Sequence, residues 1–427
     1  MIIDDLNKLF FVFLVTLLFL SLYYFAYRKF LFSIFDPLFI FLLTMSFTST
    51  LIVSIVAEPK YIFLFFLSQL MFWIGFSSVS KWSISHISNN EFKVNPRSKH
   101  ILQIITYISF LVFLISNLYM INEAGLTLFQ DNPSIAKVAS FSGGLGFVRR
   151  INWGLGNFLA VSTIVCLFIS KRKLPFLLIL IIHMGFTMLN GSKSGLISFL
   201  TIFILISFIK GLDTNKAVKN SKKFVPIMLV MSIGIGIFIL FRQSNSLEEA
   251  SFGFATRLLY SGDVAFYYYT PDILRFYKSF GFSNYILHEL NPILGMFRLT
   301  EYAEPLGSQM LNLSLSKYID FGAVIGPNTP FYVKGHIFFG DYGTGFYGLI
   351  SGGLIGYFRY KFLIIDSSKL VLKVFLLSIS NIIFLYATES NLLIGQIFDT
   401  IFFLTPIVLI SLIIYECLYS KIELNLT

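Results

Sequence analysis

The sequence predicts an all-α integral membrane protein that crosses the bilayer many times. Hydrophobic residues make up 56% of the 427 residues and charged residues only 13%, and the mean hydropathy is +0.79. These values lie outside the averages of soluble domains. The apolar residues also gather in runs of about 20, the length that a helix needs to cross the hydrocarbon core.

The apolar runs predict about eleven transmembrane helices, with ten and twelve as the alternatives. They cover residues 9–27, 38–57, 61–80, 101–121, 151–170, 174–190, 195–209, 224–241, 346–358, 370–387 and 397–415. The first run follows two acidic residues and lacks a basic lead or a cleavage site, so we expect a retained helix rather than a signal peptide. The ninth run is short and holds four glycines, which is typical of a tightly packed or broken helix rather than a lipid-facing one.

A long polar stretch, residues 242–341, separates the eighth predicted helix from the ninth. Most of the 32 Lys and Arg residues lie in the alternate, short connections, and cytoplasmic connections retain positive charge during insertion. In residues 242–341 acidic residues outnumber Lys and Arg. We therefore expect one membrane domain, residues 1–427, with a large loop at 242–341 that faces away from the cytoplasm. With eleven helices the N-terminus would lie outside and the C-terminus inside.

The net charge of +10 does not indicate a nucleic-acid partner. The positive surplus lies beside the membrane, where topology and anionic lipid headgroups explain it. Cys166 and Cys417 both fall in predicted helices and are too isolated for a zinc site or a disulfide framework. We expect neither a metal nor a structural disulfide.

Arginines of the outer connections are the candidate anion-binding residues. The planar guanidinium binds phosphate or diphosphate oxygens in pairs and stays charged in a partly dehydrated site. They are Arg242, Arg257, Arg275 and Arg298 in the long loop, and Arg149 and Arg150 before the fifth predicted helix. Arg242 is the first choice because it directly follows an apolar run. The alternative is that each arginine only reaches to the membrane interface.

Two further features of the outer side have both a structural and a functional interpretation. Residues 190–195 lack the spacing of a phosphate-binding loop, so they predict a turn between helices; alternatively, Lys193 faces an anionic headgroup. The long loop is dense in Tyr and Phe, which pack on sugar rings but are also common in interface belts.

His336 stands near the end of the long loop, in a run rich in Gly and Pro, residues 326–341. We expect this run not to be helical and to return His336 and Asp341 to the membrane surface near Arg242. A histidine with a pKa of about 6.5 can accept a proton from an attacking hydroxyl at neutral pH. The alternative is an interfacial histidine that only completes a hydrogen bond.

The layout of the whole chain resembles the O-antigen and related polysaccharide repeat-unit polymerases of the Wzy type. These have some eleven or twelve helices and one large outer loop late in the sequence. Members can carry Arg, ten residues, then Gly in their outer loops, and Arg242 with Gly253 fits that spacing. No glycine follows Arg149 or Arg150 at that spacing, which is a departure from a paired-loop pattern. The chain is similar also to the lipid-linked O-antigen ligases, in which arginines and a late-loop histidine, by position His336, serve diphosphate chemistry.

The resemblance implies a GT-C-like glycosyltransferase of a bacterial cytoplasmic membrane, acting in lipopolysaccharide or capsule biosynthesis with its long loop facing the periplasm or exterior. It would move a growing glycan from undecaprenyl diphosphate to a new undecaprenyl-diphosphate-linked repeat unit, without a nucleotide sugar or other cofactor. Membrane lipids, a chain-length regulator and a flippase are the implied partners. The diphosphate is already a good leaving group, so cations and at most one base are needed.

The predicted roles follow from this chemistry. Arg242 and Arg257 hold the diphosphate, and His336 is the base or orients the hydroxyl. Secondary substrate contacts come from Arg149, Arg150, Lys193, Gly253, Arg275, Arg298 and Asp341.

Two other classes of protein remain open at this point. A ligase that joins finished glycan to a lipid or protein acceptor would share the fold, the loop and the arginines. A flippase for lipid-linked oligosaccharides should show similar halves, short loops and buried charges. The long loop and the few charges within predicted helices, such as Lys373 and Asp399, fit a flippase less well.

Overall fold

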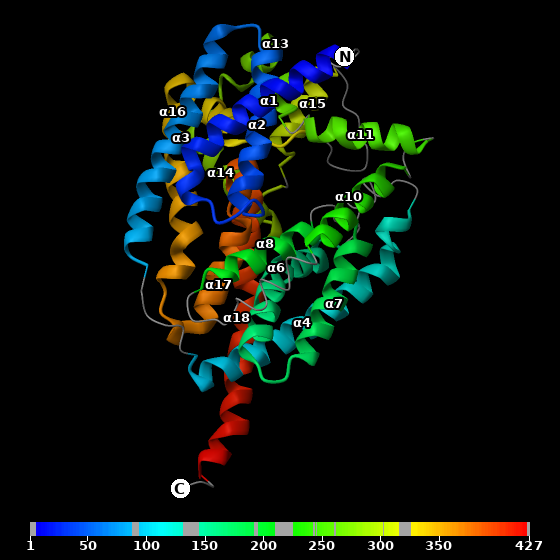
Figure 1. Ribbon diagram of the computed structural model, residues 1–427, viewed down its shortest axis with the longest axis vertical. Coiled ribbons are helices and arrows are strands. Elements are labelled where there is room, and N and C mark those ends of the chain that lie inside the picture. The colour runs from blue at the N-terminus through cyan, green and yellow to red at the C-terminus, as the bar shows by residue number, and fades with distance from the viewer. Residues whose placement is uncertain are drawn as a thin grey trace. The chain divides into compact units, whose positions relative to one another are not determined.

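The regular elements of the protein are helices wherever the structure describes the chain (Figure 1). The computed structural model describes residues 6–87, 94–130, 145–191, 195–209, 225–241, 244, 246–259, 262–301, 303–315 and 326–424. The chain forms two compact units. Unit 1 comprises Met1–Ile84, Ser246–Tyr357 and Ile383–Ile394, and unit 2 comprises Ser85–Asn245, Phe358–Ile382 and Gly395–Thr427.

The helices of each unit come from distant parts of the sequence. Unit 1 contains α1 (Leu6–Tyr27), η1 (Arg28–Phe30), α2 (Pro37–Ile55), α3 (Pro59–Ser85), α11 (Leu247–Leu259), α12 (Val264–Tyr268), α13 (Pro271–Tyr277), α14 (Phe282–Met296), α15 (Leu306–Ser314), most of α16 (Phe331–Ile364) and the start of α18 (Leu385–Leu424). Unit 2 contains α4 (Pro96–Ala124), η2 (Thr127–Phe129), α6 (Gly146–Ile169), α7 (Leu174–Leu189), α8 (Gly195–Ser207), α10 (Val225–Phe241), η3 (Ser367–Lys369), α17 (Leu370–Ile382) and the remainder of α16 and α18.

The prediction of a helical protein is confirmed for the described residues, and its apolar helices are consistent with a chain that crosses the membrane several times. Each predicted apolar run falls on one helix except residues 370–387, which span the break between α17 and α18. Within the described ranges, six helical segments are long and apolar enough to cross a membrane: Phe10–Phe30, Pro37–Ile55, Pro59–Ser85, Pro96–Phe129, Gly146–Ile169 and Leu385–Leu418. Leu174–Leu189 and Ile197–Ser207 are apolar but shorter. The finer count of eleven stays a prediction.

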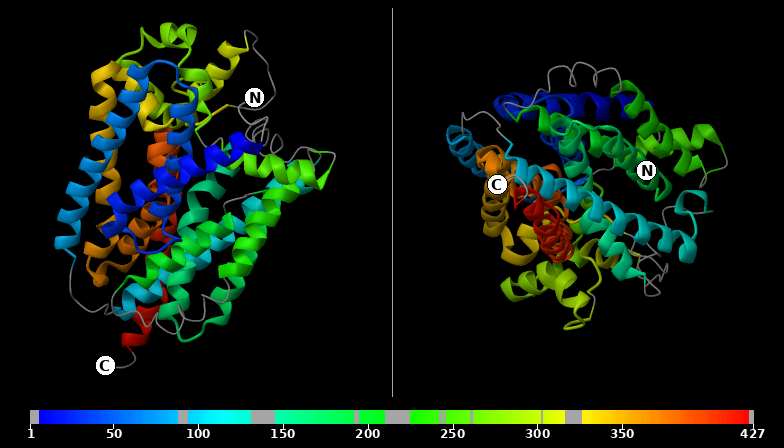
Figure 2. Two further views of the ribbon diagram at one scale, coloured as in Figure 1. Left: turned by 45° about the horizontal axis from the view of Figure 1, so that its top comes forward. Right: turned by 90° about the horizontal axis from the view of Figure 1, so that it is seen from below.

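In unit 1, α16 packs on α3 through a row of glycines. The two helices run side by side in Figure 1 and in the left view of Figure 2. Ideal Cβ atoms on Gly348, Gly352 and Gly356 would lie 2.6, 2.0 and 2.8 Å from carbonyl oxygens of α3. The backbones approach this closely only because these positions, one helical turn apart, have no side chain. The predicted tight packing of the glycine-rich ninth run is confirmed on the side that faces α3, but the expectation that this helix does not face lipid is not, since Phe346, Ile350 and Leu354 of the same run are exposed.

Replacement of Gly352 by alanine is expected to destabilise unit 1 by about 1–3 kcal/mol, the usual cost of overpacking. The new methyl group would lie 2.0 Å from the carbonyl oxygen of Phe72. Gly353→Ala is the matched control, because a Cβ there would meet nothing nearer than Cγ2 of Val79 at 3.7 Å. Thermal unfolding of the detergent-purified variants measures the difference, and equal melting temperatures would contradict it.

The expectation that residues 326–341 are not helical is wrong from Phe331 onward. Helix α16 begins there and is interrupted only at Gly340, whose φ of 69° and ψ of −165° produce a kink. Pro327 and Pro330 stand before the helix, where proline does not break it. Gly335 is accommodated by close packing, since a Cβ there would lie 3.0 Å from Cα of Thr344.

Unit 2 is built around α6, which contacts α4, α7, α8 and α17. Helices α4, α6 and α7 lie side by side in Figures 1 and 2. The core is apolar, but polar side chains join the helices within it. Nδ2 of Asn381 on α17 donates to Oδ1 of Asn157 at 3.0 Å and to Oγ of Ser198 at 2.9 Å. Such bonds satisfy polar groups that the surrounding apolar core cannot.

Candidate functional site

Both ring nitrogens of His336 are engaged within unit 1. On one side Nε2 lies 2.9 Å from Oδ1 of Asp341, which follows the kink at Gly340. On the other side Nδ1 hydrogen-bonds the hydroxyl of Tyr268 on α12. Since a carboxylate can only accept, we assign the proton of the neutral ring to Nε2, which leaves Nδ1 to accept from the tyrosine.

Asp341 links the histidine to a cation. Its Oδ2 lies 2.7 Å from Nζ of Lys60, in the first turn of α3. The hydrogen bond from Lys60 is the main cause that lowers the pKa of the Asp341 carboxyl, against some burial and with help from His336. The exposed fraction of the side chain rises from 16% for His336 to 39% for Asp341 and 55% for Lys60. A carboxylate has about four acceptor positions, so Asp341 can accept a further hydrogen bond from a ligand.

Aromatic rings surround the His336 side chain. Tyr61 and Tyr268 both stand edge-on to it, with ring centroids 5.7 Å away. Burial raises the pKa of Tyr268 well above its usual value, so its hydroxyl stays a hydrogen-bond donor. The rings fix the imidazole in place and leave Asp341 and Lys60 as the accessible end of the group. We call Lys60, Tyr268, His336 and Asp341 the His336 site.

A second polar group in unit 1 is fully buried. Nζ of Lys334, only 1% exposed, lies 3.0 Å from Oε1 of Glu289 on α14 and 3.3 Å from Oε1 of Glu389 on α18. Glu389 departs from helical geometry, with φ −158° and ψ 82°, and accepts a hydrogen bond of 2.7 Å from the backbone N–H of Thr329. We call Glu289, Lys334 and Glu389 the buried ion cluster.

The buried ion cluster holds more acid than its lysine can balance. Burial tends to raise the pKa of Glu289, but the charge of Lys334 and several hydrogen bonds outweigh it and lower that pKa. Ser390 bridges the ions, since its Oγ accepts from Lys334 at 2.9 Å and donates to Glu289 at 2.8 Å. Nδ1 of His288 lies 3.6 Å from Oε1 of Glu289. Oε2 of Glu289 and both His288 nitrogens have no hydrogen-bond partner among the described residues.

Three of the predicted substrate contacts have exposed side chains or open space around them. Arg275 on α13 is exposed, and so is Arg298, which follows α14 with a φ of 55°. Gly253 lies on α11, and a Cβ there would meet no atom within 4 Å.

The predicted pair Arg149 and Arg150 belongs to unit 2, in the first turns of α6. The guanidinium of Arg150 forms an ion pair with the buried carboxylate of Asp399 on α18. Its Nη2 lies 2.7 Å and its Nε 2.9 Å from Oδ1 of Asp399. This ion pair engages two nitrogens of the Arg150 guanidinium with a carboxylate, and the predicted substrate contact of Arg150 stays a prediction.

Three predicted residues have no described side chain. Arg242 and Lys193 lie outside the described residues, and Arg257 lies on α11 but its side chain is likewise outside them. The predicted diphosphate contacts of Arg242 and Arg257 are therefore still predictions.

Sequence reasoning missed Lys60 and the buried ion cluster. Lys60 could have been found as a basic residue in the first turn of an apolar run, next to Tyr61. Lys334 and Glu289 stood in a stretch that we took for an outer loop, where a charge needs no explanation. Glu389 was overlooked although it sits between two apolar runs, and a charge in such a place is a functional candidate.

Comparison with models of known families, with curated proteins and with solved structures gives no match. In the described ranges, no three or more His, Cys, Asp and Glu side chains are grouped so that they could hold a metal ion.

Proposed function

We propose that this protein polymerises lipid-linked oligosaccharide repeat units at the outer face of a bacterial cytoplasmic membrane. The observation that supports the proposal best is the His336 site. It combines an accessible carboxylate, a histidine behind it and a lysine beside it. A hydroxyl nucleophile needs an acceptor for its proton, and a diphosphate leaving group needs cations.

In the proposed reaction, Asp341 accepts a hydrogen bond from the hydroxyl of the incoming repeat unit. The oxygen of this hydroxyl bonds to C1 of the donor sugar as the bond from C1 to the phosphate oxygen breaks. Undecaprenyl diphosphate leaves with the electron pair, and the hydroxyl proton passes to the Asp341 carboxylate, which the Nε2–H of His336 orients. Lys60 keeps Asp341 ionised and adds positive charge near the leaving group. Arg242 and Arg257 are the further cations that we propose for the diphosphate.

Deletion of the gene tests the proposal, with surface and lipid-linked glycans compared on a gel. We expect acceptors that carry a single repeat unit and no ladder of longer glycans. Full-length glycan retained on the lipid carrier, with bare acceptors, would instead identify a ligase. Loss of every outward-facing repeat unit would identify a flippase, and an unchanged ladder would rule out all three activities.

A further inference from the structure

Helix α14 in unit 1 has the reverse of the side-chain distribution expected for a helix in water. Its buried side chains are polar: His288, Glu289 and Asn291. Its exposed large side chains are apolar: Phe282, Ile286, Leu287 and Leu290. Ser283 and Asn284 are also exposed, and neither carries a charge. A surface helix of a soluble domain buries its apolar side and exposes its charges.

Helix α14 packs on α16, which packs on a helix long and apolar enough to cross a membrane. Tyr285 on α14 packs on Phe338, Phe339 and Tyr347 of α16, with ring centroids 5.5, 5.1 and 5.7 Å apart. Helix α16 in turn packs on α3, which is long and apolar enough to cross a membrane.

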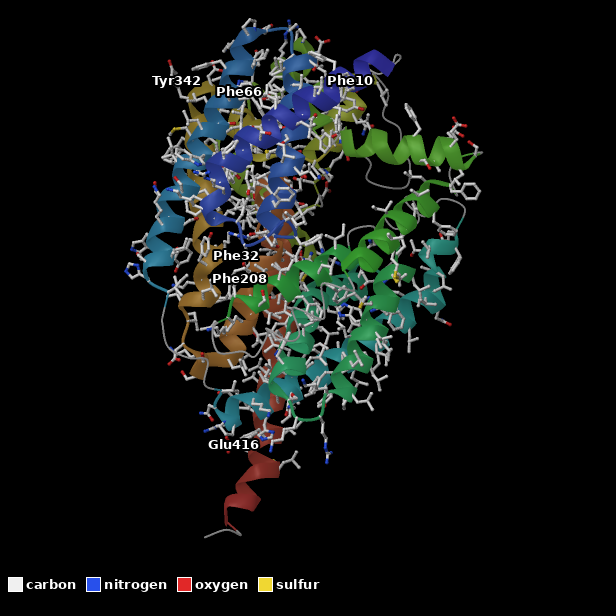
Figure 3. All side chains as sticks on the ribbon, in the orientation of Figure 1. Phe10, Phe32, Phe66, Phe208, Tyr342 and Glu416 are labelled. Atoms are coloured by element: carbon white, nitrogen blue, oxygen red, sulfur yellow. The ribbon has the colours of Figure 1, made fainter. Side chains whose placement is uncertain are left out.

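An exposed apolar row runs down α16 as well. It starts at Tyr342, which is 96% exposed and is labelled in Figure 3, and continues at intervals of four residues. The continuing residues are Phe346, Ile350 and Leu354. Exposed apolar surface in one row along a helix faces lipid in a membrane protein.

Basic residues stand at both ends of α14. Lys278 precedes it and Arg298 follows it, and both are exposed. Long basic side chains at the ends of an apolar segment reach the headgroup layer while their stems cover apolar surface. This gives Arg298 a different partner from the glycan diphosphate considered above. The helix has 15 residues, about 22 Å at 1.5 Å per residue, which is too short to cross a hydrocarbon core of about 30 Å.

We infer that α14 is embedded in the membrane interface, with its apolar side on the acyl chains of the bilayer and Lys278 and Arg298 at the headgroups. The segment between the eighth and ninth predicted helices is then not wholly in water, and the buried ion cluster lies behind a lipid-facing helix. On the polar side, which would be costly in lipid, Glu289 is bonded by Lys334 and Ser390, and Asn291 by the backbone of Glu301 and Ala303. This inference does not depend on the proposed polymerase activity.

Spin labels at single cysteines test the inference. The exposed Cys417 is replaced by serine, and the buried Cys166 is retained. Labels are attached at Leu287→Cys and Leu290→Cys in the full-length protein, in nanodiscs of phosphatidylcholine and phosphatidylglycerol with one protein per disc. Leu70→Cys, exposed in the middle of α3, is the lipid-facing control, and Asp272→Cys, exposed on α13, is the water-facing control.

Molecular oxygen concentrates in lipid, whereas a nickel chelate stays in water. We expect oxygen to relax the labels at Leu287 and Leu290 more than the nickel chelate does, as we also expect for the label at Leu70. Preferential relaxation by the nickel chelate, as at Asp272, would overturn the inference. A label that neither reagent reaches would show that α14 packs on protein, such as a second copy of the chain, and would overturn it as well. Only labelled variants that elute from a size-exclusion column as the wild type does are compared. Two positions on α14 are labelled so that the test can still be made if one variant does not fold.

Discussion

A His336→Ala variant is expected to reduce glycan polymerisation by at least about 10²-fold, the usual contribution of a positioned proton acceptor. The ring donates to Asp341 and accepts from Tyr268, so its removal leaves Asp341, the proposed proton acceptor, without the hydrogen bond that orients it. The measurement is the glycan ladder of a deletion strain complemented with each variant, at equal amounts of tagged protein in the membrane.

The controls for this prediction use a matched pair of aspartates in unit 1. Asp341→Asn should cause a loss similar to that of His336→Ala, because an amide cannot accept the proton. Asp272→Asn, on the exposed first turn of α13, should leave the ladder unchanged. A full ladder from the His336→Ala strain would remove His336 from the mechanism even if the deletion strain behaves as a polymerase mutant.

A Lys334→Met variant is expected to destabilise the protein by about 3–5 kcal/mol, the usual cost of breaking a buried ion pair from one side. Methionine fills a similar volume but leaves Glu289 and Glu389 without the ammonium that lies 3.0 and 3.3 Å from them. Thermal unfolding in detergent, followed by size-exclusion chromatography, measures the effect, and we expect a large loss of the folded fraction.

Two comparisons separate lost charge from lost packing in this case. A triple variant with Lys334→Met, Glu289→Gln and Glu389→Gln should regain much of the stability, because it has no uncompensated buried charge. Lys278→Met, which changes an exposed lysine of the same unit, should stay within about 0.5 kcal/mol of the wild type. If the Lys334→Met protein had the melting temperature of the wild type, Lys334, Glu289 and Glu389 would not all be charged in the folded protein.

The helices themselves were largely predictable from the sequence. Runs such as residues 101–121 and 151–170 coincide with α4 and α6 because an apolar run of this length has few alternatives to a helix in lipid. The glycines of the ninth run likewise indicated a close helix contact, which the structure gives as the packing of α16 on α3. Both features are local, so the order of residues along the chain is enough to find them.

Errors arose where a rule for soluble chains was applied to the polar stretch between the eighth and ninth runs. Gly335 and Pro330 indicate against a helix at 331–339, but Pro330 precedes α16, and Gly335 lies within it where a Cβ would come 3.0 Å from Cα of Thr344. Helix α14 lies in the stretch predicted to be an outer loop, and its buried side chains include His288 and Glu289. The spacing of apolar and polar residues along a helix is the same whichever side faces the protein, so this spacing did not show that the polar side is buried.

The sequence by itself determined the class of protein, the places of its apolar helices and the candidate residues His336 and Asp341, because hydropathy and side-chain chemistry are properties of short segments. Only the tertiary structure decided which groups meet: Lys60 with Asp341, Tyr268 with His336, and Lys334 with two carboxylates from helices α14 and α18. These pairs join residues far apart along the chain, and their energies depend on distance and burial. Neither quantity is set until the helices have packed.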